Sequence, residues 1–94
     1  MKTARAHVII EGLVQGVFFR AHTRDTAENY GLRGWVKNNH NGTVEAVFEG
    51  AEDSARKMVE WCKKGPPAAR VEDVEVAWED YKNEFKAFTI LYRD

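Results

Sequence analysis

The chain has 94 residues, enough for one hydrophobic core and too few for two, so we expect a single domain over residues 1–94. Fifteen acidic and fourteen basic residues give a formal net charge of −1, and this balance leaves no basic excess for a nucleic-acid partner. A single cysteine rules out an internal disulfide, and no Cys and His residues cluster at metal-ligand spacing.

The first half of the chain begins with a predicted strand that ends at Gly12. Its apolar residues alternate with other residues and would share one face: Ala6, Val8 and Ile10. A glycine-containing turn follows over residues 12–16. Helical spacing marks the next segment, which would start near Ala21 and could be capped by Gly31. One face of this helix would carry Thr23, Thr26, Ala27 and Tyr30.

Two strands joined by a tight turn are predicted next. Residues 34–38 form the first of them, and Asn41-Gly42 is a strong signal for the turn because both residues tolerate a positive φ. The following strand alternates, which predicts a half-buried strand with Val47 and Glu49 on its outer face. The residues expected to point inward are Val44, Ala46 and Phe48.

The second half contains another amphipathic helix and two more strands. Helical spacing places four residues on one apolar face: Ala55, Met58, Val59 and Cys62. Acidic residues in its first turn and lysines in its last suit the helix dipole, and Gly65-Pro66-Pro67 would end it. Alternation then predicts a fourth strand with Val74, Val76 and Trp78, and a last strand with Phe88, Ile90 and Tyr92. The polar residues 81–84 would form the turn between them.

The order of elements is therefore β-α-β-β-α-β-β. This order predicts an α+β protein with a ferredoxin-like split βαβ sandwich, in which an antiparallel sheet carries two helices on one face. The pattern leaves open where the final strands lie in the sheet.

The loop over residues 12–20 is the strongest candidate for a binding site. A glycine-containing loop that leads into a helix aims backbone N–H groups at one point, where they suit a phosphate. Arg20 adds a permanent charge and a planar set of donors that match phosphate oxygens. An ordinary strand–helix turn with a surface arginine would show the same spacing.

Asn38 is the second candidate, at the end of the second predicted strand. Asparagine is also common near turns for local reasons. In the split βαβ order, however, Asn38 and the loop that ends at Arg20 could face one shallow site.

Two long motifs resemble the acylphosphatase family. Residues 10–20, Ile-Glu-Gly-Leu-Val-Gln-Gly-Val-Phe-Phe-Arg, are similar to the first signature of that family. Residues 34–38, Gly-Trp-Val-Lys-Asn, with Gly42, Val44 and Gly50 after them, are similar to the second. Residues 65–71, Gly-Pro-Pro-Ala-Ala-Arg-Val, resemble the loop before the family's fourth strand.

The resemblance implies an enzyme, an acylphosphatase that hydrolyses the carboxyl–phosphate anhydride bond of a small acyl phosphate without a metal or cofactor. It implies that Asn38 orients the attacking water and that a phosphate oxygen of the substrate accepts the proton. The substrate phosphate would be held by Arg20 and by the backbone amides of Gln15, Gly16, Val17, Phe18 and Phe19. Such a site has no general acid, which an acyl phosphate does not need because its leaving group is a stable carboxylate.

The main alternative is a ferredoxin-like binding module without catalysis, because this fold also hosts RNA-binding and regulatory domains. An RNA-binding module needs basic and aromatic residues on its central strands, whereas the third strand here carries Glu45 and Glu49. A site of this type could also bind a phosphorylated metabolite without turning it over. No segment has the length of a membrane span or a signal peptide, so we expect a cytoplasmic monomer with no membrane partner.

Overall fold

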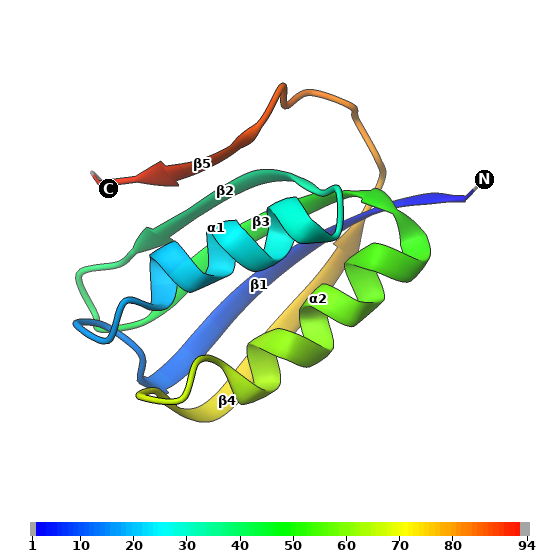
Figure 1. Ribbon diagram of the computed structural model, residues 1–94. Helices are drawn as coiled ribbons and strands as arrows, with labels where there is room; N and C mark the ends of the chain where they lie inside the picture. Colours follow the sequence, from blue (N-terminus) through cyan, green and yellow to red (C-terminus); the bar gives the residue numbers. More distant parts are fainter. Residues whose placement is uncertain (1, 93–94) are drawn as a thin grey trace.

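The computed structural model describes residues 2–92 and shows an open five-stranded sheet with two helices against one face (Figure 1). In chain order the elements are β1 (Thr3–Leu13), α1 (Phe19–Asn29), β2 (Arg33–Asn38), β3 (Val44–Ala51), α2 (Glu52–Lys64), β4 (Arg70–Glu79) and β5 (Phe88–Leu91). The predicted ferredoxin-like α+β class is confirmed. No helix among residues 2–92 is long and apolar enough to cross a membrane.

The strands lie in the order β4-β1-β3-β2-β5. β1 pairs antiparallel with β3 and β4, and β2 pairs antiparallel with β3. β5 pairs with β2 in parallel, so the sheet is mostly but not entirely antiparallel. The prediction of a turn between the last two strands is wrong, because β4 and β5 lie at opposite edges of the sheet. Residues 80–87 instead cross the end of the sheet from one edge to the other (Figure 1).

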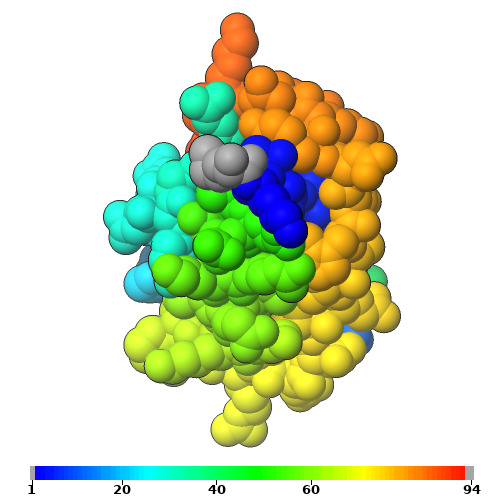
Figure 2. All heavy atoms as spheres, turned by 90° about the vertical axis from the view of Figure 1, so that its right-hand side faces the viewer, coloured from blue at the N-terminus to red at the C-terminus, as the bar shows by residue number. Residues whose placement is uncertain are grey.

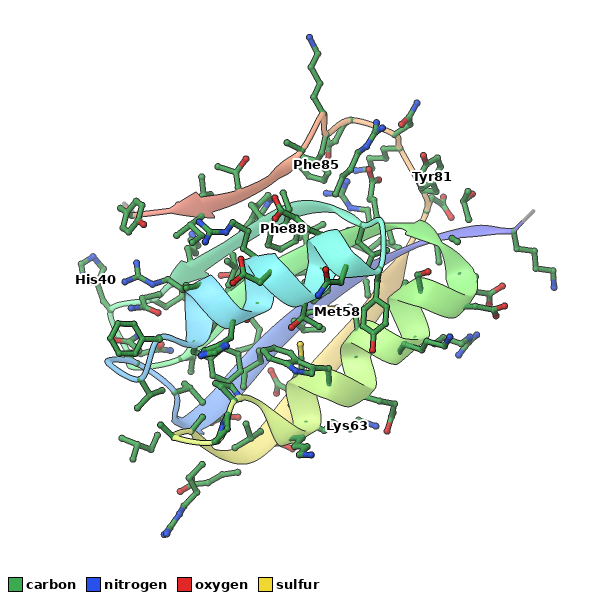
Figure 3. All side chains as sticks on the ribbon, in the orientation of Figure 1. His40, Met58, Lys63, Tyr81, Phe85 and Phe88 are labelled. Atoms are coloured by element: carbon green, nitrogen blue, oxygen red, sulfur yellow. The ribbon has the colours of Figure 1, made fainter. Side chains whose placement is uncertain are left out.

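The core lies between the helices and the sheet, and its strand and α2 residues are those that the alternation and the helical spacing predict. Ala6, Val8 and Ile10 on β1 and the whole predicted face of α2 are buried. In Figure 3 the Met58 side chain points from α2 into this layer. Cys62 is buried in the same layer, and burial raises the pKa of its thiol, so the thiolate needed for reactivity is disfavoured.

The first helix and the fourth strand differ in detail from the sequence analysis. Helix α1 begins at Phe19, two residues before Ala21, and of its predicted face Thr23 and Ala27 are buried whereas Tyr30, which follows the helix, is exposed. Gly31, with φ 73°, ends the helix as predicted. Trp78 lies on the predicted fourth strand and is 45% exposed, because β4 is an edge strand. Its ring stacks on the guanidinium of Arg56, 5.1 Å from the ring centroid.

β3 is buried on both faces, which corrects the half-buried strand predicted from its alternation. Val47 and Glu49 are each only 2% exposed although they face away from the helices. Glu49 Oε2 accepts a hydrogen bond from Arg5 at 3.2 Å and another from the Lys82 amide at 2.8 Å. Glu49 Oε1 accepts one from the Glu84 amide at 3.2 Å. The segment after β4 supplies two of these donors, Lys82 and Glu84, and in Figure 2 this segment, in orange, lies beside the start of β1, in blue.

Glu49 makes stability depend on pH. Burial alone would raise the pKa of this carboxyl, but the donors from Lys82, Arg5 and Glu84 outweigh it and hold the pKa below its ordinary value. The carboxylate therefore stabilises the fold above the pKa of an unfolded glutamate, about 4.3, and this contribution is lost as pH falls through the lower folded pKa.

We expect Glu49→Gln to lower the free energy of unfolding at pH 7 by about 2 kcal/mol, because the buried Arg5 loses the most buried of its three carboxylate partners. The gap between wild type and variant should shrink as pH falls below about 4. Urea unfolding at pH 7, 4 and 3 measures this difference in the free energy of unfolding. The control variant is Glu72→Gln, because Glu72 is an exposed glutamate on β4. A gap that stays constant over this range would contradict the assignment.

Candidate active site

The loop between β1 and α1, residues 14–18, has a backbone that curls around a point in front of the helix. Gly16 and Phe18 both have positive φ, 75° and 61°, and such a reversal of hand turns successive N–H groups toward one side. A positive φ is unusual for a phenylalanine. None of the backbone amides of residues 15–18 donates to an acceptor within residues 2–92. These amides are available to a ligand.

The N-terminus of α1 is also left open. Its cap position, Phe18, provides no side-chain hydrogen bond, and the first turn contains no acidic residue. α2 differs, because Glu52 and Asp53 lie in its first turn. The first N–H groups of a helix have no partner inside the helix, and the helix dipole makes this end positive. α1 therefore presents an uncompensated positive end to the loop.

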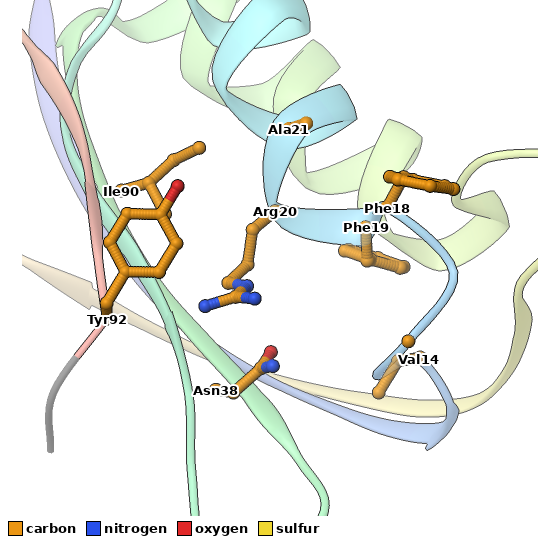
Figure 4. A pocket seen from close by; sticks show the side chains of 9 residues that line it. Val14, Phe18, Phe19, Arg20, Ala21, Asn38, Ile90 and Tyr92 are labelled. Atoms are coloured by element: carbon orange, nitrogen blue, oxygen red, sulfur yellow. The ribbon is translucent and has the colours of Figure 1, made fainter.

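A pocket of about 270 Å³ lies where the loop, α1, β2 and the end of the chain meet (Figure 4). The loop and α1 supply Val14, Gly16, Phe18, Phe19, Arg20 and Ala21, and the other lining residues are Asn38, Ile90 and Tyr92. Both predicted side chains, Arg20 and Asn38, thus open into one cavity. Of the five predicted amide donors, Gly16, Phe18 and Phe19 line it, whereas Gln15 and Val17 belong to the loop but do not.

Arg20 lies in the first turn of α1, and its guanidinium carbon is 5.0 Å from the ring centroid of Tyr92. Figure 4 shows the guanidinium between the Tyr92 ring and Asn38. No carboxylate within residues 2–92 forms an ion pair with it. A guanidinium in contact with an aromatic face keeps its charge and its hydrogen-bond donors for an anion.

Asn38 is the last residue of β2 and pairs with Val44 at the end of the ladder. Its side-chain oxygen Oδ1 is buried and has no hydrogen-bond partner among the described residues. Buried acceptors are nearly always paired in folded proteins. An amide oxygen in this position has room in its lone pairs to accept a hydrogen bond from a small donor such as water.

The side chain of Gln15 has a role that the sequence did not reveal. Its Nε2 donates to the backbone oxygens of Asn39 at 2.8 Å and Thr43 at 2.9 Å. Asn39 in turn donates to Thr43 Oγ1 at 3.0 Å and to Glu45 at 3.2 Å. Gln15 therefore ties the loop to the turn that follows Asn38, and this fixes the two halves of the pocket relative to each other.

The pocket lining contains no Asp, Glu or His among the described residues, so it offers no general acid or base with a pKa near neutrality. Carboxylates gather elsewhere. Glu11, Asp73 and Glu75 bring oxygens within 4.8 Å of one another on the exposed surface of β1 and β4, and they do not line this pocket.

Fold and pocket together define a class of protein, a ferredoxin-like α+β domain with a cationic pocket at its first strand–helix loop. The chain belongs to the acylphosphatase family, because the family model described as Acylphosphatase matches residues 6–90.

Relatives in sequence and in structure agree with this membership. A curated protein of Pyrobaculum islandicum named Acylphosphatase is 58% identical over 92 residues, which are 97% of this chain and 97% of that protein. The structure of an acylphosphatase from Coxiella burnetii is 39% identical, with a TM-score of 0.90, and the match covers 95% of this chain and 93% of the other. The acylphosphatase from Bacillus subtilis is 36% identical with a TM-score of 0.90, and the match covers 95% of this chain and 99% of the other.

Proposed function

We propose that this protein hydrolyses acyl phosphates to a carboxylate and inorganic phosphate. Its membership of the acylphosphatase family supports the reaction. One observation carries the assignment to this pocket. The guanidinium of Arg20, which has no ion-pair partner within residues 2–92, shares the cavity with the buried Asn38 Oδ1, which has no hydrogen-bond partner there.

The loop and Arg20 hold the phosphoryl group in this proposal. The guanidinium donates to two of its oxygens, and the positive end of α1 lies behind them. The remaining donors are the backbone amides of Gln15, Gly16, Val17, Phe18 and Phe19. Fixed donors of this kind stabilise the charge that the three phosphoryl oxygens carry in the transition state.

Asn38 positions the nucleophile. A water donates one hydrogen bond to Oδ1, which directs an oxygen lone pair toward phosphorus. An amide has no useful basicity, so a phosphoryl oxygen of the substrate takes the proton of this water. The new bond joins the water oxygen to phosphorus, and the bond between phosphorus and the acyl oxygen breaks. The electron pair leaves with the carboxylate, so one acyl phosphate dianion and one water give a carboxylate and dihydrogen phosphate.

The absence of acidic and histidine side chains from the described lining also selects the substrate. A phosphate monoester expels an alkoxide, which needs a proton from a general acid. An acyl phosphate expels a carboxylate, which is stable at neutral pH. Positioning and charge stabilisation are therefore sufficient for an acyl phosphate and insufficient for a monoester.

Hydrolysis of benzoyl phosphate, followed by ultraviolet absorbance, tests the function. We expect turnover that persists in EDTA and no measurable release of phosphate from glycerol 3-phosphate, because this alkyl monoester expels an alkoxide that needs a proton and the pocket supplies no general acid. Folded protein without turnover of benzoyl phosphate would contradict the proposal and would favour a phosphate-binding module. Turnover lost in EDTA and restored by a metal ion would contradict the metal-free mechanism.

We also propose that one chain forms the complete enzyme and that it works as a monomer in the cytoplasm. One chain by itself brings Arg20, Asn38 and the loop together in one pocket, and its one cysteine is buried as a thiol. Sedimentation equilibrium combined with the benzoyl phosphate assay tests the monomer. Activity that falls as the protein is diluted would contradict it.

A further inference from the structure

Two aromatic side chains stand exposed at the mouth of the pocket. Phe18 is 79% exposed and Tyr92 is 74% exposed, and both line the cavity that contains Arg20. Every other exposed large hydrophobic residue within residues 2–92 is covered to a greater extent, and Leu13, the next in order, is 59% exposed. Exposed aromatic surface gives no stability to the fold, so these two rings need another explanation.

The backbone conformation of Phe18 accounts for the shape of the loop but not for the presence of an aromatic side chain there. Its left-handed conformation turns the loop amides toward the pocket. Asparagine or glycine would adopt this conformation more readily and would supply the same amide. A phenylalanine at this position therefore contributes its ring to the pocket, and no fold requirement accounts for it.

Tyr92 forms the opposite wall together with Ile90. The two residues alternate along the chain from β5, so they lie on the same side of the pocket, beside the guanidinium of Arg20 (Figure 4). The Tyr92 ring holds one face of that guanidinium. The wall is thus apolar next to the group that binds phosphate.

The reaction geometry points the acyl group toward these rings. In an in-line displacement the leaving group departs on the side opposite the attacking water. The proposed water lies on Asn38, whose Oδ1 is buried, and the phosphoryl group lies on Arg20 and the loop. The acyl group must then extend toward the open mouth, where the two most exposed lining rings lie.

We propose that Phe18, Ile90 and Tyr92 form an acyl subsite that selects acyl phosphates with apolar acyl groups, aromatic ones above all. This inference rests on the proposed function. Arg20 is the only charged side chain among the described residues that line the pocket, and its donors are engaged by the phosphoryl group. An acyl group that carries a second negative charge therefore finds apolar rings and no counter-ion of its own.

Relative values of kcat/KM for benzoyl, acetyl and succinyl phosphate test the subsite. We expect the wild-type protein to prefer benzoyl over acetyl and acetyl over succinyl phosphate. Phe18→Ala and Tyr92→Ala should each lower the benzoyl-to-acetyl ratio about tenfold, the effect expected for an apolar contact in a specificity pocket. Leu91→Ala is the matched control, because Leu91 is an exposed apolar residue of β5 that does not line the pocket.

Two measurements keep the result unambiguous. The inhibition constant of inorganic phosphate shows whether Arg20 still binds phosphate in each variant. Tyr92→Leu keeps an apolar wall and should therefore retain most of the preference for benzoyl phosphate. A benzoyl-to-acetyl ratio that stays at the wild-type value in both alanine variants would overturn the subsite while leaving the proposed function intact. Absence of turnover on all three substrates would instead overturn the proposed function.

Discussion

Replacing Arg20 by glutamine is expected to remove measurable turnover, a loss of at least about 1,000-fold in kcat/KM, and to weaken phosphate binding about 100-fold. The guanidinium is the only charged side chain in the described lining, and glutamine keeps a hydrogen-bond donor but loses the charge and the planar fork. Benzoyl phosphate hydrolysis gives the turnover, and competitive inhibition or calorimetric titration with inorganic phosphate gives the binding.

Arg24→Gln provides the matched control for this experiment. Arg24 lies one turn further along α1 and pairs with Asp25 outside the pocket. The Arg24→Gln variant should therefore keep near-normal kcat and KM. Far-ultraviolet circular dichroism of both variants verifies the fold. If folded Arg20→Gln protein bound phosphate as well as the Arg24→Gln variant, Arg20 would not be the phosphate ligand.

Asn38→Ala is expected to lower kcat about 100- to 1,000-fold while the inhibition constant of inorganic phosphate changes little. The alanine removes the acceptor that orients the water, but Arg20 and the loop amides still bind the phosphoryl group. This separation of turnover from binding distinguishes a water-positioning residue from a phosphate ligand.

Two further variants sharpen the test of Asn38. Asn38→Asp keeps the size of the side chain but adds a negative charge beside the phosphoryl group, so phosphate binding should weaken as well as turnover. Asn29→Ala, at the exposed end of α1, controls for the loss of an asparagine elsewhere. Near-normal turnover by Asn38→Ala would exclude the assigned role.

Local periodicity was sufficient for the elements that make up the core. Residues 55, 58, 59 and 62 all face the sheet from α2, because a helix buries residues at this spacing whatever the rest of the chain does. The position of β5 could not be read in this way. Its parallel register with β2, which pairs Val36 with Ile90, joins segments far apart in sequence, and alternation shows only which side chains share a face.

The same limit applies to the pocket. Arg20 and Asn38 could be placed together because the split βαβ order brings the first loop and the end of the second strand to one side. The Gln15 side chain and Tyr92 were missed, since each depends on a contact with a distant backbone or side chain. Glu49 was placed on the outer face of a half-buried strand for the same reason, because alternation does not show that Lys82 and Glu84 bind it.

The pocket joins residues from early in the chain to residues in and just after β5, so the chain order sets the sequence in which the site can form during synthesis. The loop and Arg20 are made early, whereas Tyr92 follows every other residue of the pocket. At roughly 5–20 residues per second the ribosome adds Tyr92 several seconds after Arg20. A nascent chain can therefore present the phosphate-binding loop well before it has the wall that faces the acyl group.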